Sequence, residues 1–348
     1  MNDLSIQAHG VLFPVLTQLH LGEPVERFLD NGGKSLLFGE DADEYVSGQM
    51  NAARLKHETL DRWHALIDSA TRRAGPLLTA ADADISAVHR LQGVAPALPS
   101  AVQAAAMSAD ELETLCLRTA RVIKDAGINL VLSPTADIVT GPNVWLAGRT
   151  LADDPESAAR IVRAYVSGVR RAGVATTLKH FPGHPELSRH PASEEAEVSL
   201  PLDRLRALWA PFKAGIEAGA EAVMMGPAIF NAVQPSVAAS ISPDLIALLR
   251  GELNFRGLVM TCDLDHKATL RDATPGDAAV VALNAGADLL LLSPRSVPAI
   301  AQIVAAIVIA VETGRLPAAR LAAAAAAVIR RTGTRNPGLS TSLNASGS

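Results

Sequence analysis

The stretch Leu178-Lys179-His180-Phe181-Pro182-Gly183-His184 indicates how this chain folds. It ends an apolar run at residues 174–178 and changes at once to a lysine, two histidines and a Pro-Gly turn. A buried strand that leads directly into polar side chains is typical of an α/β barrel, because the strands hold positions and the following loops carry the chemistry. The stretch therefore predicts a strand followed by a site loop near the middle of the chain.

Similar apolar runs, each bounded by turn residues, occur along the whole chain. Most are separated by segments of helical period with recognisable starts, such as the capping box of Ser108 and Glu111 and the pair Asp154-Pro155. Strands that are apolar on both faces and alternate with helices form a parallel sheet. Eight such units predict a single-domain (β/α)8 barrel of the TIM type. The expected strands are residues 10–15, 35–38, 76–81, 129–133, 174–178, 222–225, 258–262 and 288–292.

The end of the chain differs in composition from the rest. The alanine-rich residues 317–331 favour a helix with one apolar face, which we expect to close the barrel from outside. Gly, Ser, Asn and Pro then dominate. We therefore expect a barrel domain at residues 1–335 and a disordered tail at residues 336–348.

Bulk composition narrows the classes of partner. The chain has 348 residues, 49% of them apolar, and a net charge of −5. Its basic residues are scattered, which argues against nucleic acid and anionic membranes as partners. The longest apolar run, residues 303–311, is about half the length of a membrane span. Two cysteines and an amino terminus without signal-peptide features favour a cytoplasmic protein, which we expect to be a monomer.

Polar residues gather where the expected strands end. Carboxylates, one lysine, one histidine and one arginine from separate strands and loops would converge there into a polar cup. Each sugar hydroxyl needs both a donor and an acceptor, so such a cup suits a small-molecule carbohydrate. The residues are Asp82 and Asp84, Asp137, Arg149, Lys179 and His180, and finally Cys262, Asp263, Asp265 and His266.

Two segments carry a family resemblance. Residues 179–184 read Lys-His-Phe-Pro-Gly-His, and residues 248–257 read Leu-Leu-Arg-Gly-Glu-Leu-Asn-Phe-Arg-Gly. Here the chain resembles glycoside hydrolase family 3, specifically its single-domain bacterial β-N-acetylglucosaminidases, and the resemblance extends over roughly residues 12–332. It implies a barrel that needs no cofactor and binds a terminal sugar. The expected sugar-binding residues are Asp82, Arg90, Asp137, Arg149, Lys179 and His180.

The same resemblance implies that the catalytic positions are substituted. A gapless match places Cys262 at the family's nucleophilic aspartate and Asp263 beside it, while His190 and Ala192 fall on the acid/base dyad. Retaining hydrolysis needs a carboxylate and a proton donor about 5 Å apart. A cysteine nucleophile would form a thioglycoside that breaks down slowly. These substitutions predict a sugar-binding pseudoenzyme with lost or strongly reduced hydrolysis.

Three alternatives remain open. The chain could be an active glycosidase or transglycosidase that uses Asp263 or Cys262 with His190 or Glu186. It could be a scaffold for a protein partner, although no large apolar stripe supports that. Finally, His180, His184 and His190 raise the possibility of zinc. They lie around a Pro-Gly turn rather than on one helix face, so we expect no metal.

Overall fold

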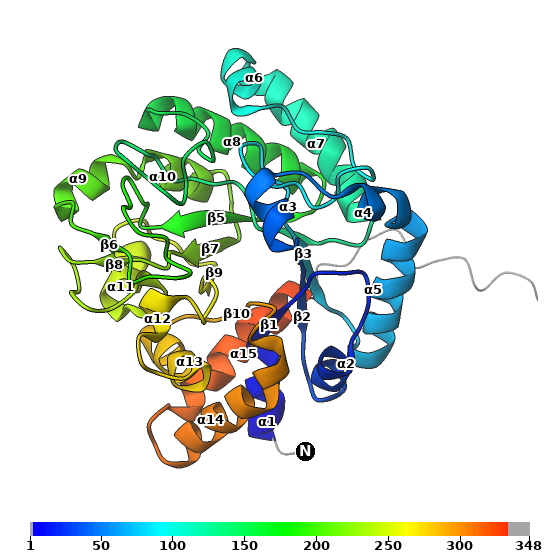
Figure 1. The fold of residues 1–348 in the computed structure, drawn as a ribbon, viewed down its shortest axis with the longest axis vertical. Coiled ribbons are helices and arrows are strands. Elements are labelled where there is room, and N and C mark those ends of the chain that lie inside the picture. The colour runs from blue at the N-terminus through cyan, green and yellow to red at the C-terminus, as the bar shows by residue number, and fades with distance from the viewer. Residues whose placement is uncertain (1–2, 333–348) are drawn as a thin grey trace, which may run out of the picture.

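Residues 3–332 are described by a computed structural model, and the tail predicted at 336–348 lies outside them. Eight parallel strands form one sheet in the order β10-β1-β2-β3-β4-β5-β7-β9 (Figure 1). The ends of this sheet meet at a bridge between Met260 and Leu289, so the predicted (β/α)8 barrel is confirmed. The strands are β1 (Leu12–Leu16), β2 (Ser35–Phe38), β3 (Leu78–Ala81), β4 (Leu130–Val131), β5 (Ala175–Phe181), β7 (Ala222–Met225), β9 (Leu258–Met260) and β10 (Leu290–Leu292).

Strands β4 and β5 differ most from the expected bounds. β4 is only two residues long, and Pro134, which has no N–H to donate, follows soon after its end. β5 instead continues to Phe181, because its pairing with β7 resumes after a register shift between Lys179 and Phe181. The first residues of the site loop are therefore part of the sheet.

The seam between β9 and β10 depends partly on side chains. Backbone bonds include Thr261 N–H to the Leu289 carbonyl, at 3.0 Å. The Thr261 hydroxyl accepts the Leu291 N–H at 3.0 Å, and the Asp288 carboxylate accepts the Val259 N–H at 3.1 Å. The barrel therefore closes through fewer regular ladder bonds at this seam than between its other strands.

Alternation along the strands separates two apolar clusters. In β9, Leu258 and Met260 belong to the cluster inside the barrel, whereas Val259 packs with the surrounding helices. Large aliphatic and sulfur-containing side chains fill the interior, as in other barrels of this type. The interior cluster consists of Phe13, Leu37, Leu78, Ala80, Leu130, Leu132, Ala222, Met224, Leu258, Met260, Cys262, Leu289, Leu291 and Val328.

Helices surround the strands, as Figure 1 shows. Two predicted helix starts are confirmed: Ser108 and Glu111 form a capping box, and Asp154 caps the helix that begins at Pro155. The helices are α1 (Asp3–Gly10), α2 (Glu23–Asp30), α3 (Ala42–Ser47), α4 (Ala52–His57), α5 (Leu60–Ala74), α6 (Ala101–Ala106), α7 (Ala109–Asp125), α8 (Pro155–Arg171), α9 (Leu202–Ala207), α10 (Ala210–Glu217), α11 (Pro243–Gly251), α12 (Lys267–Leu270), α13 (Pro275–Ala285), α14 (Ile300–Glu312) and α15 (Ala318–Thr332).

The alanine-rich helix α15 packs against α1 and also contacts β3. Its Val328 joins the interior cluster, so this helix covers one end of the barrel. The apolar run at 303–311 lies within α14. No helix among residues 3–332 combines the length and apolar character needed to cross a bilayer.

Candidate functional site

On three strands, the next inward-facing position beyond the apolar interior holds a polar side chain. These positions lie at one end of the barrel, which we call the mouth. Cys262 lies two residues beyond the inward-facing Met260 and belongs to the interior cluster. Asp82 follows the inward-facing Ala80 in the same way, and Lys179 reaches it from β5. The structure thus brings Lys179 to Asp82, and Cys262 lies near enough for the Lys179 charge to act on its thiol.

A buried ion pair occupies the centre of the mouth. The Lys179 Nζ lies 2.5 Å from Asp82 Oδ1 and 3.9 Å from Asp84 Oδ2, and all three residues are buried. Burial alone would lower the pKa of Lys179, but the two carboxylates outweigh it and raise that pKa. Lys179 is therefore a permanent cation that holds two carboxylates in fixed positions.

Tyr45 and Arg149 form a second contact near this ion pair. The Arg149 guanidinium donates to the Tyr45 hydroxyl at 2.6 Å and stacks 4.6 Å from the centre of its ring. Burial raises the pKa of Tyr45, and the charges of Arg149 and Lys179 act against that rise. Since charges on Lys179 and Asp82 act on the tyrosine, the Tyr45–Arg149 pair lies beside the mouth. A ligand that used Arg149 would compete with this contact.

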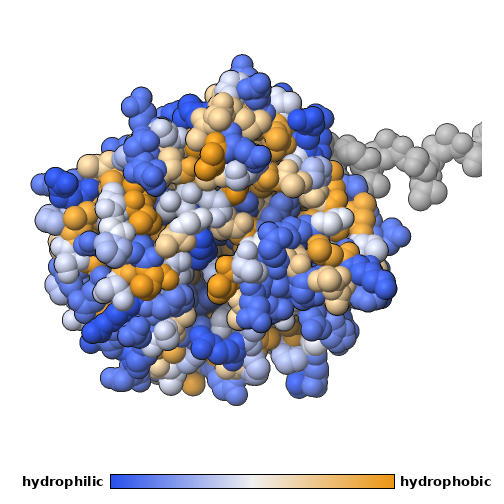
Figure 2. Space-filling model, turned by 45° about the horizontal axis from the view of Figure 1, so that its top comes forward, coloured by the Kyte–Doolittle hydropathy of each residue, from blue (hydrophilic) through white to orange (hydrophobic). Residues whose placement is uncertain are grey.

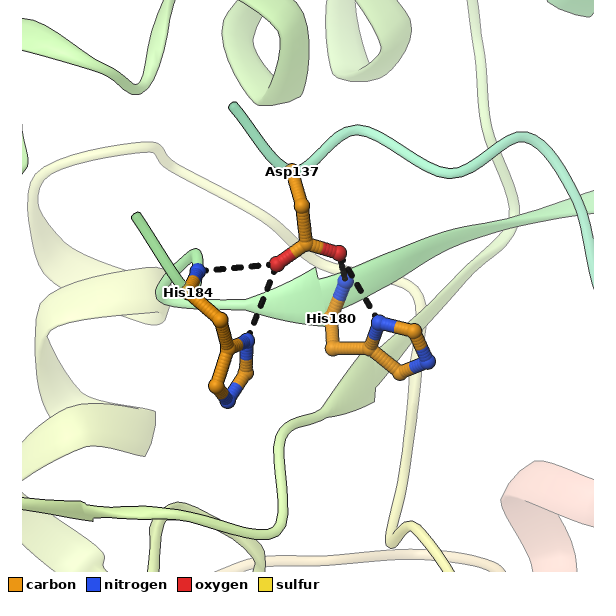
Figure 3. Close-up of side chains that lie close together, drawn as sticks. All are labelled: Asp137, His180 and His184. Carbon is orange, nitrogen blue, oxygen red and sulfur yellow. Dashed lines mark hydrogen bonds and ion pairs between the residues drawn. The ribbon is translucent and has the colours of Figure 1, made fainter. Parts of the chain in front are cut away.

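Asp137 organises the two histidines of the Lys-His-Phe-Pro-Gly-His stretch (Figure 3). Its Oδ2 accepts the His180 backbone N–H at 2.7 Å and lies 2.8 Å from the His180 Nδ1. Its Oδ1 accepts the His184 backbone N–H at 2.9 Å and lies 2.9 Å from the His184 Nδ1. One carboxylate therefore fixes both rings and the turn between them.

The charges of this cluster follow from burial. Burial acts to raise the pKa of Asp137, but His180 and His184 outweigh it and lower that pKa, so the carboxylate stays ionised. Burial lowers the pKa of His180 to about 4, so its ring is neutral at pH 7. With Nδ1 donating to Asp137, the Nε2 atom of His180 carries the lone pair and is available as an acceptor.

The same three residues are the group in the described structure whose ligand atoms lie close enough together for a metal ion. Both Asp137 oxygens are already used by N–H donors, and each Nδ1 donates to them. A metal would have to replace these bonds. His190, the third member of the predicted histidine set, is exposed and is not in this group.

Polar atoms without partners mark the space beside the ion pair. Glu40 Oε1, Asp84 Oδ1 and Arg149 Nε are buried and have no hydrogen-bond partner among the described residues. Such atoms are rare in a finished core, and they match a polar ligand or water. Figure 2 shows a face of the molecule that is hollowed near its middle, with hydrophilic residues in the hollow and hydrophobic ones in small separate patches.

Arg90 has a different place from the one expected. Its guanidinium donates twice to the Glu58 carboxylate, at 2.5 and 3.0 Å, and to the Gly39 carbonyl at 2.7 Å. It also lies 5.1 Å from the Trp63 ring, and the residue is 1% exposed. These bonds connect α4, α5 and β2, so Arg90 stabilises the fold around the mouth rather than facing it.

Cys262 lies where the mouth meets the apolar interior cluster of the barrel. The residue is 6% exposed, and burial raises the pKa of its thiol well above the usual value, with the Asp263 charge adding to the rise. Only the thiolate is a strong nucleophile. At pH 7 this side chain is therefore a neutral, buried thiol.

Asp263 points to the opposite face of the strand from Cys262 and lies near a histidine. Its Oδ2 lies 3.6 Å from the His266 Nε2, and its side chain is 31% exposed. Burial, with the charge of nearby Asp265, raises the pKa of Asp263 to about 7, and burial lowers that of His266 to about 4. Asp265 itself accepts from Ser293 at 2.6 Å.

The candidate proton donors of the loop after β5 are exposed. His190 and Glu186 both face solvent. Burial and the charge of Arg149 lower the pKa of His190. The loop docks on the segment after β9, where the Lys267 N–H donates to the Pro191 carbonyl at 3.2 Å. This contact brings the neighbourhood of His190 close to His266.

Sequence reasoning missed Glu40, Tyr45 and the Asp263–His266 pairing. Glu40 and Tyr45 follow β2, a strand whose apolar run carried no motif. A rule that every strand end of a barrel supplies site residues would have found Glu40. The i,i+3 spacing of Asp263 and His266 was visible, but helical spacing alone predicts no contact in a loop.

Comparison with known proteins agrees with this geometry. Residues 42–331 match the model of the glycosyl hydrolase family 3 N-terminal domain. The chain belongs to glycosyl hydrolase family 3. The matched segment begins after β1 and β2, so it includes the ends of the other six barrel strands.

Relatives within glycosyl hydrolase family 3 are named as hexosaminidases. A beta-hexosaminidase of Xanthomonas oryzae pv. oryzae is 36% identical over 171 residues, which are 49% of this chain and 51% of that protein. A beta-hexosaminidase of Xylella fastidiosa is 33% identical over 236 residues, 66% of this chain and 70% of that protein. The chain thus matches about half the length of the first of these relatives.

Solved structures of the family share the fold. A family 3 beta-N-acetylglucosaminidase from Paenibacillus sp. superposes with a TM-score of 0.85 at 25% identity, over 99% of this chain and 65% of that chain. A beta-N-acetylhexosaminidase from Beutenbergia cavernae superposes with a TM-score of 0.80 at 24% identity, over 95% and 98% of the two chains. The barrel of this chain is therefore the family 3 barrel.

Proposed function

We propose that this family 3 barrel binds a terminal hexosamine-type sugar at its mouth and hydrolyses glycosides very slowly or not at all. The observation that carries the proposal is the set of unpaired buried polar atoms on Glu40, Asp84 and Arg149, next to the Asp82–Lys179 ion pair. They offer donors and acceptors in fixed positions, as sugar hydroxyls require. The names of the family relatives support a hexosamine as the sugar.

Loss of hydrolysis is the second half of the proposal. The inward position at the end of β9 holds the protonated thiol of Cys262, and His190 is exposed in its loop. Binding of the ground state and stabilisation of the transition state are separable, so such a site can keep its ligand and lose its rate. The protein would then act as a sugar-binding or regulatory member of the family.

Calorimetric titration with N-acetylglucosamine tests sugar binding. We expect saturable heat in the millimolar range or below, and a loss of affinity of about tenfold or more in Lys179→Ala, because the carboxylates it holds are then displaced. Lys213→Ala, which removes a lysine from α10, is the control. Absence of heat with the unmodified protein would refute the proposal.

A second candidate function is an active glycosidase or transglycosidase of altered mechanism. The pKa of about 7 for Asp263, with the neutral His266 ring 3.6 Å away, favours it, because general acids and bases work best near the ambient pH. Turnover of a chromogenic N-acetyl-β-glucosaminide that disappears in Asp263→Asn or Cys262→Ala would establish this candidate. Turnover at the level of a buffer blank would exclude it for that substrate.

A further inference from the structure

Glu40 is the first residue beyond the paired part of β2. The Gly39 N–H still donates to the Leu16 carbonyl at 2.9 Å, which continues the ladder with β1. In the pairing of β2 with β3, Phe38 lies opposite Ala81, the residue before Asp82. In that register Asp82 lies opposite Gly39, and Glu40 is one residue further along, at the same edge of the barrel.

The carboxyl group of Glu40 is enclosed but incompletely bonded. Its Oε1 atom is buried and has no hydrogen-bond partner among residues 3–332. The charges that act on the group come from three sides: Asp82 at the end of β3, Arg90 in the loop after it, and Lys179 on β5. Arg90 is already paired with Glu58, and Lys179 is paired with Asp82. The cations near Glu40 are therefore committed to other carboxylates.

This arrangement favours the protonated form of the Glu40 carboxyl group. Burial, with the charge of Asp82, raises its pKa well above the usual value, and Arg90 and Lys179 only partly oppose the rise. A protonated carboxyl has an O–H to donate, whereas Asp82 and Asp84 accept. The β2 side of the mouth would then have a neutral donor near the acceptors on the β3 side.

We propose that Glu40 is a ligand-binding residue of the mouth that donates a hydrogen bond from its carboxyl group to an oxygen of the bound sugar. The inference rests on the proposed function and adds a specificity residue to it. The ligand oxygen is a hydroxyl or an amide carbonyl, since both accept a hydrogen bond. Family resemblance does not assign this position, which lies before the segment that matches the family model.

Calorimetric titration of N-acetylglucosamine into the full chain at pH 7 tests the proposal. Glu40→Ala should weaken binding about tenfold, while Glu40→Gln, whose amide still donates, should stay within about threefold of the unmodified protein. Glu312→Ala, which removes an exposed carboxylate of α14, is the control for net charge. Thermal melting of each variant confirms that it is folded.

The comparison of variants separates a donating group from one that only fills space. Equal affinity of Glu40→Ala and the unmodified protein, or an affinity of Glu40→Gln as weak as that of Glu40→Ala, would overturn the inference alone. Failure of the unmodified protein to bind the sugar would overturn the proposed function with it.

Discussion

Cys262 and Asp263 show how much one position along a strand matters. The inward residue Cys262 stands in the mouth above Met260, and the charges of Lys179 and Arg149 reach its thiol. Asp263, one residue later, turns toward His266. Since successive strand residues point to opposite faces, a carboxylate at 263 does not replace one at 262.

Replacing the thiol by a carboxylate should therefore restore a nucleophile. We expect Cys262→Asp to hydrolyse 4-nitrophenyl N-acetyl-β-glucosaminide at least about a hundredfold faster than the unmodified protein, because this leaving group departs with little help from an acid. Release of nitrophenol measures the rate. Cys262→Asn is the matched control, and an equal rate in both variants would contradict the expectation.

For single residues, the sequence predicted which side chains lie at the strand ends better than it predicted which residues they bind. It placed Asp82, Lys179 and Cys262 together, because strand ends of a barrel converge. It could not foresee that Arg90 binds Glu58 and Gly39, since those contacts depend on how distant loops pack. The pairing of His184 with Asp137 is likewise a tertiary contact across 47 residues.

Among the elements, β9 and β10 are joined by the most irregular pairing of the barrel. The Thr261 hydroxyl is the partner of the buried Leu291 N–H. Thr261→Val should lower the free energy of unfolding by about 1 to 3 kcal/mol, because it leaves that N–H without an acceptor. Urea denaturation followed by circular dichroism measures the change.

Thr177→Val in β5 is the matched control for the same substitution. The Thr177 hydroxyl is also buried, but it has no hydrogen-bond partner among the described residues. Its replacement should leave the free energy of unfolding unchanged or slightly higher. Equal destabilisation by both variants would show that the seam does not depend on the Thr261 hydroxyl.

The order of the strands was predictable from apolar runs and helix starts, and the strand ends were not. Regular alternation of strand and helix leads to the barrel, and capping residues such as Ser108 mark helix starts locally. The extension of β5 through Phe181 depends instead on its pairing with β7. The short β6 (Glu197–Val198) and β8 (Ile229–Phe230) pair only with each other and escaped prediction for the same reason.

For the whole molecule, three buried imidazoles govern the response to acid. Burial lowers the pKa of His89, His180 and His266 to about 4 each. In the unfolded chain these groups take up protons below pH 6.5, while in the folded chain they stay neutral until about pH 4. At these three histidines the unfolded state therefore binds more protons in this window, and their contribution to stability is lost as the pH falls through it. Asp263 acts in the opposite direction, because its raised pKa lets the folded state hold a proton that the unfolded state lacks.

We expect the three histidines to lower the free energy of unfolding as the pH falls below 6.5, by on the order of 1 kcal/mol per pH unit for each, against the opposite contribution of Asp263. Urea denaturation at pH 7.5, 6.0 and 5.0 measures the slope. His89→Gln removes one of the three groups and should make the slope shallower. A slope that is the same with and without His89 would contradict the assignment.

The seam between β9 and β10 has one further consequence, for the chemistry of its neighbour. Cys262 follows Thr261 directly, so any fluctuation that parts these two strands also uncovers the thiol. The rate at which an alkylating reagent modifies Cys262 would then measure how often the β9–β10 seam opens. The buried Cys116 in α7, far along the chain from the seam, provides an internal standard.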